Sequence, residues 1–298
     1  MGDAARQGIA VGSFDGVHLG HQAIIKHAAR VLTFGANPFK QGALLTSPEE
    51  KKRLILDGHV EGERCRIEFL GEEVFGMTAE EFSTSTFLHG YKQKPIIYCG
   101  EDWRFGKGGV GSPEWLIARG FDVVVVPYAE VDGERVSSSR IRAAIERGEM
   151  ESAARMLGRN WVLTGEVVSG KGVGRQIGYP TINIEPDERL VKLPNGVYEV
   201  RYSNLKAIMN YGIAPTMGEK AWAKPVAEVH LLEDASSAQE LLQAPSPEYR
   251  AAPPSGLLAP RSLGTARIEV VRFIREERRF NSITELKAQI KEDIDGIL

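Results

Sequence analysis

The periodicity of the chain changes near residue 160, and this change constrains the fold more than any other feature of the sequence. Before residue 160, short apolar runs alternate with helical patterns. The predicted strands are 8–11, 31–34, 65–70, 95–98 and 122–126, and the predicted helices are 21–30, 48–57, 78–88, 113–118 and 139–147. Such alternation predicts a parallel α/β sheet. The unbroken apolar run 123–126 is typical of a strand that helices cover on both faces.

After residue 160, strand patterns follow one another without helices between them. They are 161–168, 181–184, 197–202, 207–211, 226–232 and 266–273. This pattern predicts a small antiparallel β-barrel. A helix over 149–157, with Gly158 as its C′ residue, ends the first half. We therefore predict two domains, residues 1–158 and 159–298.

Two further segments belong to the second half. Ser282 and Glu285 predict a capping box for a C-terminal helix, whose apolar stripe contains Ile283, Leu286, Ile290 and Ile297. Residues 235–262 are rich in Ala, Ser and Pro and have no clear period. We expect them to form a long mobile loop inserted into the barrel.

Charge and cysteine content limit the class of protein. The net charge is −3, whereas binding to nucleic acid or to a membrane surface needs a basic face. No apolar run approaches membrane-spanning length. The only cysteines, Cys65 and Cys99, match no zinc spacing, which indicates a reducing compartment. The expectation is a cytoplasmic protein that acts on small molecules, without nucleic-acid or membrane partners.

The segment GSFDGVHLGHQAII follows the first strand and opens the first helix. Backbone N–H groups at a helix start attract phosphate, and glycines let the backbone approach a nucleotide closely. His18 and His21 add two donors there. The candidate nucleotide-binding residues in this segment are Gly12, Phe14, Asp15, Gly16 and Gly20. A glycine-rich turn with incidental histidines is the alternative, and a metal site would lack a third ligand.

A second cluster, VSSSRIR, opens the helix predicted at 139–147. Ser137, Ser138 and Ser139 are candidate phosphate ligands, or simply N-cap residues. Arg140 and Arg142 oppose the helix dipole by about 0.3–1 kcal/mol each, a penalty that a bound polyphosphate would reverse.

A glycine-rich loop, CGEDWRFGKGGVG, follows the fourth strand. It carries Asp102, Arg104 and Lys107, and the alternative reading is an ordinary solvated loop. The C-terminal half contains the similar-looking GEVVSGKG, which is not a P-loop: Gly172 follows Lys171 where Ser or Thr is required, and a strand pattern comes next.

That C-terminal stretch nevertheless contains the strongest functional signal. A pliable loop carries the candidate phosphate-binding residues Gly170, Lys171, Gly172, Gly174 and Arg175. Thr181 and Asn183 are two apart on a strand, so their oxygens share one face and suit a magnesium ion beside phosphate. Glu228 shares a face with Val226 and His230, and could take a proton from a hydroxyl nucleophile. A solvent-facing strand residue is the alternative.

The N-terminal segments resemble the nucleotidyltransferase superfamily. His18-Leu19-Gly20-His21 matches its HxGH signature, and the run 137–142 resembles its ISSTxxR signature. The runs SFDGVHLGH and GEDWRFGKG resemble the FAD synthetase module of bacterial bifunctional enzymes. The resemblance implies a Rossmann-like domain in which the His pair and Arg142 contact ATP phosphates and Asp102 lies near nucleotide and metal. The implied reaction joins FMN to the α-phosphorus of ATP and releases pyrophosphate, largely by positioning and charge neutralisation. Where the family has F-D/E-P-H-P, this chain has Gly35 and Asn37 in place of the acid and the histidine.

Residues 160–298, apart from the insertion, resemble riboflavin kinase. The motifs GKGVGRQIGYPTINI, LPNGVYEV, MNYGIAPTMG, VAEVHLLE and IREERRFNSITELKAQIKED occur in that family's order. The resemblance implies that Thr181 and Asn183 hold Mg²⁺ with ATP, that the glycine loop covers the phosphates and that Glu228 is the base for the terminal ribityl hydroxyl. It places Arg275 and Phe280 near the flavin. Leu263 and Glu233 stand where the family has Tyr and Asp.

The sequence therefore predicts an enzyme that makes FMN from riboflavin and FAD from FMN, each time with ATP. Two alternatives remain at this stage: a riboflavin kinase with a silent N-terminal half, and a flavin-binding carrier or regulator without catalytic activity.

Overall fold

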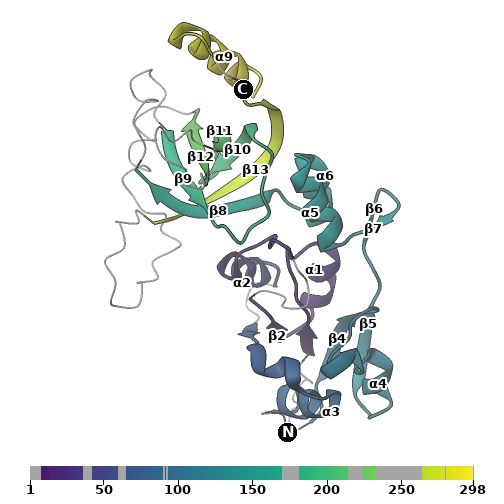
Figure 1. The fold of residues 1–298 in the computed structure, drawn as a ribbon. Coiled ribbons are helices and arrows are strands. Elements are labelled where there is room, and N and C mark those ends of the chain that lie inside the picture. The colour runs from purple at the N-terminus through teal and green to yellow at the C-terminus, as the bar shows by residue number, and fades with distance from the viewer. Residues whose placement is uncertain are drawn as a thin grey trace, which may run out of the picture. The chain divides into compact units, whose positions relative to one another are not determined.

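The computed structural model describes residues 8–35, 42–59, 65–89, 91, 93–169, 181–213, 224–232, 264–278 and 280–297 (Figure 1). The chain divides into two compact units: residues 1–140 with 156–158, and residues 141–155 with 159–298. The predicted domain boundary after residue 158 stays a prediction. The predicted insertion 235–262 and the glycine loop at 170–175 lie outside the described residues.

The first unit contains a five-stranded parallel sheet, which confirms the predicted α/β architecture (Figure 1). In the order β3-β2-β1-β4-β5, its strands are β3 (Arg66–Phe69), β2 (Arg30–Thr33), β1 (Gly8–Val11), β4 (Ile96–Gly100) and β5 (Asp122–Val126). The helices are α1 (Leu19–Ile25), α2 (Pro48–Asp57), α3 (Ala79–Phe82) and α4 (Pro113–Ile117), with a π-helical turn at Ser83–Phe87. A small hairpin joins β6 (Glu130–Val131) to β7 (Glu134–Arg135). The predicted helix 21–30 was too long, because Arg30 already belongs to β2.

Apolar side chains cover both faces of the central strand β1. Ile9 and Val11 belong to one buried cluster, with Phe82 and Phe87, whereas Ala10 belongs to another, with residues of α1 and α2. This division follows from the alternation of side chains along a strand. The central strand is thereby fixed between two layers of helices.

Strand β5 corrects one prediction. It lies at the edge of the sheet, and Val124 and Val125 are 42% and 39% exposed. The expectation of helices on both of its faces was wrong. The β-branched run favours a strand, but its position in the sheet depends on pairing with β4, which no local pattern encodes.

The second unit is a closed barrel in the strand order β10-β11-β12-β9-β8-β13, which confirms the predicted antiparallel barrel. Its strands are β8 (Trp161–Val168), β9 (Thr181–Pro186), β10 (Gly196–Tyr202), β11 (Leu205–Ile213), β12 (Pro225–Leu231) and β13 (Thr265–Glu276). Ser203 and Asn204 join β10 to β11 with φ angles of 49° and 68°, as a two-residue hairpin turn of type I′ requires. Trp161, Tyr198 and Tyr211 are buried large side chains of this unit.

The described residues contain three further helices, α5 (Ser138–Glu146), α6 (Met150–Leu157) and α9 (Ile283–Asp295). Gly158 follows α6 at φ +73°, as predicted for a C′ glycine. In α9, Ser282 Oγ accepts the N–H of Glu285 (3.1 Å), whereas the Glu285 carboxylate accepts the N–H of Asn281 (3.1 Å). In the predicted capping box, the Glu285 carboxylate would accept the N–H of Ser282. It accepts the N–H of the preceding residue, Asn281, instead.

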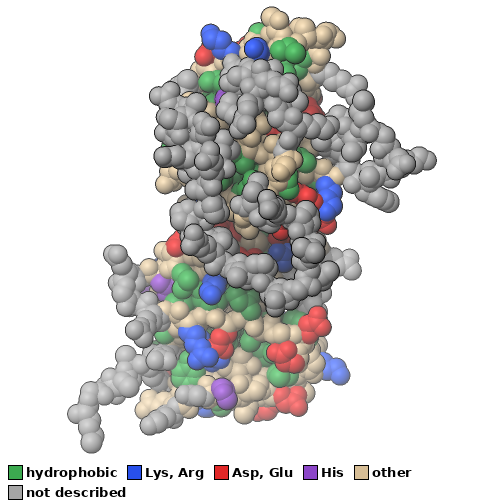
Figure 2. Space-filling view, turned by 90° about the vertical axis from the view of Figure 1, so that its left-hand side faces the viewer, with side chains coloured by type: hydrophobic (Ala, Val, Ile, Leu, Met, Phe, Trp, Pro, Cys, Tyr) green, Lys and Arg blue, Asp and Glu red, His purple; other side chains and the backbone are tan. Residues whose placement is uncertain are grey.

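The predicted apolar stripe of α9 is covered only in part. Ile297, which follows the helix, is 8% exposed, but Ile283 is 63% exposed. The buried carboxylate of Asp293 on α9 forms an ion pair with Arg275 on β13 (2.7 Å). Among the described residues, no helix has the length and apolar character needed to cross a membrane. In Figure 2, the described part of the surface carries both acidic and basic side chains.

Candidate functional site

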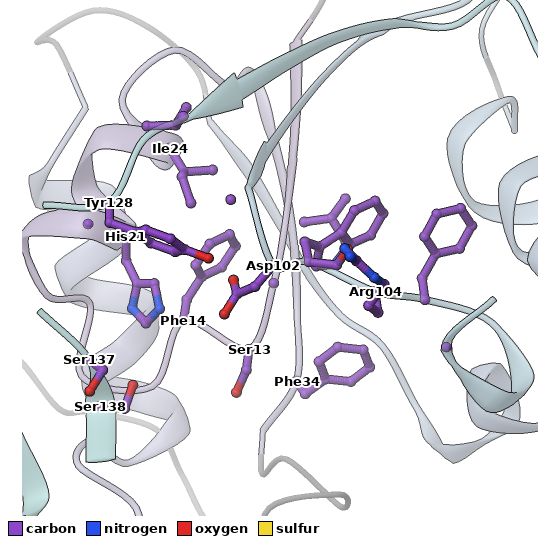
Figure 3. Close-up of a pocket in the computed structure, with 18 of the residues that line it drawn as sticks. Ser13, Phe14, His21, Ile24, Phe34, Asp102, Arg104, Tyr128, Ser137 and Ser138 are labelled. Carbon is purple, nitrogen blue, oxygen red and sulfur yellow. The ribbon is translucent and has the colours of Figure 1, made fainter. Parts of the chain in front are cut away.

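A cavity of about 760 Å³ lies in the first unit, at the carboxyl ends of the parallel strands (Figure 3). The loops after β1, β4 and β5 supply most of its wall. Ligands of open α/β sheets bind at this edge. Nine residues proposed from the sequence line it: Gly12, Phe14, His18, Gly20, His21, Asp102, Arg104, Ser137 and Ser138.

The loop after β1 has an unusual backbone. Phe14 and Val17 have φ angles of 47° and 41°, values that cost non-glycine residues energy and persist where the surroundings impose them. Gly16 has φ +84°, and a Cβ there would lie 2.8 Å from Leu45. The Asp15 carboxylate accepts the N–H of Leu45 (2.9 Å). Asp15 and Gly16 thus anchor the loop rather than line the cavity.

The two histidines stack on each other. His18 is the N-cap of α1, and its Nδ1 accepts the N–H of His21 at 3.4 Å. Their ring centroids are 3.5 Å apart, and the Phe14 ring meets the edge of His21 at 5.3 Å. Because Nδ1 of His18 accepts a hydrogen bond, the neutral ring carries its proton on Nε2. The pair can therefore present N–H donors to an anion at the start of α1.

The serines at the start of α5 have separate roles. Ser137 Oγ accepts the N–H of Arg140 (3.2 Å), so Ser137 caps the helix. Ser138 Oγ donates to the Asp15 carbonyl (2.9 Å), which ties this helix to the loop after β1. Arg140 pairs with Glu134 (3.0 Å), and this pairing offsets the unfavourable position of a cation near a helix start. The cavity wall includes Ser137 and Ser138.

Ser139 and Arg142 are not among the residues that line this cavity. Arg142 belongs by its contacts to the second unit, as does most of α5. The phosphate-binding role predicted for Arg142 therefore stays a prediction.

A charged cluster that includes two unpredicted residues spans the cavity wall. Asp102 pairs with Arg135 (2.6 Å), whose guanidinium lies 3.4 Å from the centre of the Tyr128 ring. Figure 3 shows His21, Ser137 and Ser138 on one side of Asp102. Sequence reasoning missed Arg135 because it missed the β6–β7 hairpin. The Asp132-Gly133 pair, with φ angles of 58° and 75°, is the turn signal that could have revealed it.

The opposite side of the cavity is aromatic. The rings of Trp103 and Phe105 stack with centroids 4.6 Å apart, and Phe82 lies 5.4 Å from Phe105. Phe34 and Phe75 also line this side. Arg104 donates to the Trp103 carbonyl (2.7 Å), so its cation lies along the wall. One cavity thus joins a polar end to a planar, apolar end.

In the barrel, strand register brings the predicted kinase residues together. Glu228 on β12 lies opposite Asn183 on β9 and opposite Asn210 on β11, while Thr181 lies opposite His230. Directly opposed residues have Cβ atoms roughly 4.5–5.5 Å apart. Their neighbours in the strands are buried in the barrel: Ile182, Ile184, Ala227 and Val229. Thr181, Asn183 and Glu228 therefore share its outer face, and Asn210, which the sequence analysis did not single out, lies beside Glu228.

The remaining candidate residues of the barrel are the predicted flavin contacts, Arg275 and Phe280, and those of the glycine loop. The Arg275 guanidinium binds the buried Asp293 carboxylate and lies 6.0 Å from the centre of the Phe280 ring. Gly170, Lys171, Gly172, Gly174 and Arg175 lie outside the described residues. Within the described part of the chain, no group of three or more His, Cys, Asp or Glu side chains forms a metal centre.

Comparisons with known proteins agree across both halves. A family model described as FAD synthetase matches residues 2–140, and one described as riboflavin kinase matches residues 157–297. The bifunctional riboflavin kinase/FMN adenylyltransferase of Bacillus subtilis (strain 168) is 32% identical, with 98% of this chain and 91% of the relative covered. The protein of that name from Escherichia coli (strain K12) is 30% identical, with 96% and 90% covered. A crystal structure titled as a macrolide-efflux protein from Streptococcus pneumoniae is similar, with a TM-score of 0.72, 25% identity and coverage of 99% and 94%.

Proposed function

Because the chain belongs to the family of bifunctional riboflavin kinases/FMN adenylyltransferases, we propose that its two halves carry out the family's reactions in succession, with ATP and Mg²⁺. The barrel transfers the γ-phosphoryl group of ATP to riboflavin, which gives FMN and ADP. The N-terminal half joins FMN to the AMP part of a second ATP, which gives FAD and pyrophosphate. The observation that carries the N-terminal assignment is one cavity with a polar and an aromatic end.

The polar end is suited to the nucleotide phosphates. His18 and His21 present ring donors, and Ser137 and Ser138 add hydroxyl groups beside the start of α5. The aromatic end, with Phe34, suits the planar isoalloxazine ring. A volume of about 760 Å³ falls within the usual range for ligand pockets, roughly 300–1,000 Å³.

Adenylyl transfer then needs no protein nucleophile. An oxygen of the FMN phosphate forms a bond to the α-phosphorus while the bond to the pyrophosphate oxygen breaks. The side chains contribute alignment and neutralisation of charge. Arg135 places a positive charge at the cavity wall, and the Asp102 carboxylate pairs with it. Magnesium favours one or two carboxylates together with phosphate oxygens, so Asp102 fits as the residue that would hold it.

The barrel site supports phosphoryl transfer to a hydroxyl group. Glu228 accepts the proton of the terminal ribityl hydroxyl as that oxygen attacks the γ-phosphorus. Thr181 and Asn183 place neutral oxygens on the same outer face, as a magnesium ion shared with ATP requires. The glycine loop 170–175 is proposed to cover the phosphates, as it is in the family. Arg275 and Phe280 are proposed to contact the flavin from the side of α9.

The two thiols support a cytoplasmic location for these reactions. Cys65 and Cys99 form no disulfide with each other. Burial raises the pKa of the Cys99 thiol to about 12 and that of Cys65 to about 11, so both stay protonated at neutral pH. Neither is poised for redox chemistry.

His21→Ala tests the N-terminal assignment, because the same chain reports on both reactions. The variant and the wild type receive riboflavin, ATP and magnesium, and FMN and FAD are separated by chromatography. FMN formation is expected to persist in the variant while FAD formation falls by about 10²–10³, the usual loss for one preorganised donor. His27→Ala, at an exposed histidine just after α1, serves as the matched control and should behave as wild type.

Other outcomes would select the alternatives. If His21→Ala forms FAD as fast as the wild type, this cavity is not the site of adenylyl transfer. A wild-type chain that makes FMN but no FAD is a riboflavin kinase with a silent N-terminal half, and a chain that makes neither is a flavin carrier.

A further inference from the structure

Lys51 is a buried cation directly behind the N-terminal cavity. It lies near the start of α2 and is 1% exposed. Its Nζ donates to the carbonyl oxygens of Ser13 (2.9 Å) and Phe34 (2.6 Å). Ser13 and Phe34 follow β1 and β2, and both line the cavity, whereas Lys51 does not.

Several features show that this arrangement is costly. Lysine is rarely buried without a carboxylate partner in direct contact. Burial lowers the pKa of Lys51 to about 8, and the nearby Asp15 opposes this shift only in part. The position near the N-terminus of α2 is also unfavourable for a positive charge.

The contact does fix the orientation of two peptide groups. In a trans peptide the C=O and the following N–H point in opposite directions. A Ser13 carbonyl held by Lys51 therefore directs the N–H of Phe14 away from Lys51, because the two bonds point in opposite directions within the peptide plane. The Phe34 carbonyl does the same for the N–H of Gly35. Both N–H groups thus point away from the buried amine.

We propose that Lys51 is a positioning residue for FMN adenylylation, which holds the loops after β1 and β2 so that their amides and its own charge favour bound phosphate. This inference rests on the proposed adenylyl transfer in the N-terminal half. It assigns to α2 a function in the reaction, although no side chain of α2 lines the cavity in the described structure. Lys51 acts through Ser13 and Phe34 and does not touch the reacting atoms.

Lys51→Met tests the proposal, because it keeps an unbranched apolar chain and removes the charge and the donors. Lys52→Met is the matched control, since Lys52 is the exposed neighbour on the same helix. FAD formation from FMN is measured at varied ATP, FMN formation from riboflavin is measured on the same samples, and amide hydrogen exchange is followed over residues 12–17 and 33–35.

We expect kcat/KM for ATP in FAD formation to fall on the order of 10²-fold in Lys51→Met, the cost of a misplaced reacting geometry. FMN formation should stay unchanged, and amide exchange in the two loops should become faster. Lys52→Met should match the wild type in all three measurements. FAD formation that is the same in both variants overturns the proposal, even if exchange changes, because the contact is then only structural.

Two further outcomes need their own interpretation: a wild type that forms no FAD, and a Lys51→Met variant that forms no FMN. If the wild type forms no FAD, the proposed function fails, and unchanged exchange in Lys51→Met then overturns the positioning role as well. If Lys51→Met loses FMN formation as well as FAD formation, the variant has lost its fold. Thr33→Val then takes its place as the test variant. Thr33 Oγ1 donates to the same Ser13 carbonyl (3.0 Å) from a buried position. A smaller loss of FAD formation alone supports the proposal, and no loss overturns it.

Discussion

The role proposed for Glu228 follows from the residues on either side of it. It is exposed on β12, and the amide side chains of Asn183 and Asn210 stand opposite it on the two neighbouring strands. A carboxylate beside neutral amides on an open face is accessible to a hydroxyl substrate.

Glu228→Gln should abolish FMN formation selectively. If Glu228 is the base, the rate of FMN formation falls by about 10²–10⁴, while FAD formation from added FMN is retained. Both rates are measured by chromatography of the same reactions. Glu166→Gln, at an exposed carboxylate on β8, is the matched control and should leave both rates unchanged. Normal FMN formation by Glu228→Gln would remove this carboxylate from the mechanism.

Lys51 should give the folded protein a distinctive dependence on pH. Its pKa is lowered from 10.5 to about 8 in the folded chain. Between these values the unfolded chain binds the proton and the folded chain does not, so the free energy of unfolding contributed by this group rises with pH. Urea denaturation from pH 8 to pH 10.5 should show a smaller rise for Lys51→Met than for Lys52→Met. Equal slopes would mean that Lys51 is not desolvated.

At the scale of elements, short segments are held in place by contacts that depend on single residues. Helix α6 is followed by Gly158, whose φ of +73° suits glycine. A Cβ at this position would lie 2.7 Å from Leu19 at the start of α1. Gln22 of α1 also donates to the Leu157 carbonyl (2.9 Å). The end of α6 therefore fixes the position of the helix that carries the histidine pair.

Gly158→Ala should destabilise the N-terminal unit beyond the cost of the backbone conformation alone. A left-handed conformation costs an L-residue about 1–2 kcal/mol, and the contact with Leu19 adds to it. Gly133→Ala is the matched control, because φ is +75° there and no atom lies within 4 Å of the added Cβ. The free energy of unfolding is measured by urea denaturation. An equal loss in the two variants would show that Leu19 moves aside without cost.

At the scale of the whole molecule, the two compact units do not coincide with the two halves of the sequence. Residues 141–155 belong to the unit of the barrel, although they precede it in the chain. Gly148 illustrates this packing, since a Cβ there would lie 3.7 Å from Pro194 and Phe273. The segment between the two family matches thus helps to complete the second unit.

A barrel fragment should make FMN without the N-terminal half. Residues 159–298 contain every proposed kinase residue, so this fragment is expected to fold and to convert riboflavin to FMN. A fragment of residues 141–298 should be more stable, because it restores the packing around Phe273. Thermal unfolding and FMN formation are compared for the two fragments. A folded fragment that makes no FMN in either form would show that the N-terminal half completes the kinase site.

The sequence by itself determined what local patterns encode. The alternation of strands and helices predicted the parallel sheet, and the later run of strands predicted the barrel. His18, His21, Thr181, Asn183 and Glu228 could be proposed as site residues, because motifs and side-chain alternation are local properties. The end of α6 at Gly158 was predicted for the same reason.

Only the tertiary structure decided which distant residues meet. The register of three barrel strands placed Asn210 beside Glu228, and the strand order made β5 an edge strand with exposed valines. The contact of Lys51 with the loops after β1 and β2 is equally invisible in the sequence around it. Pairing and burial depend on the packing of segments far apart in the chain, and such packing leaves no periodic signal in any one of them.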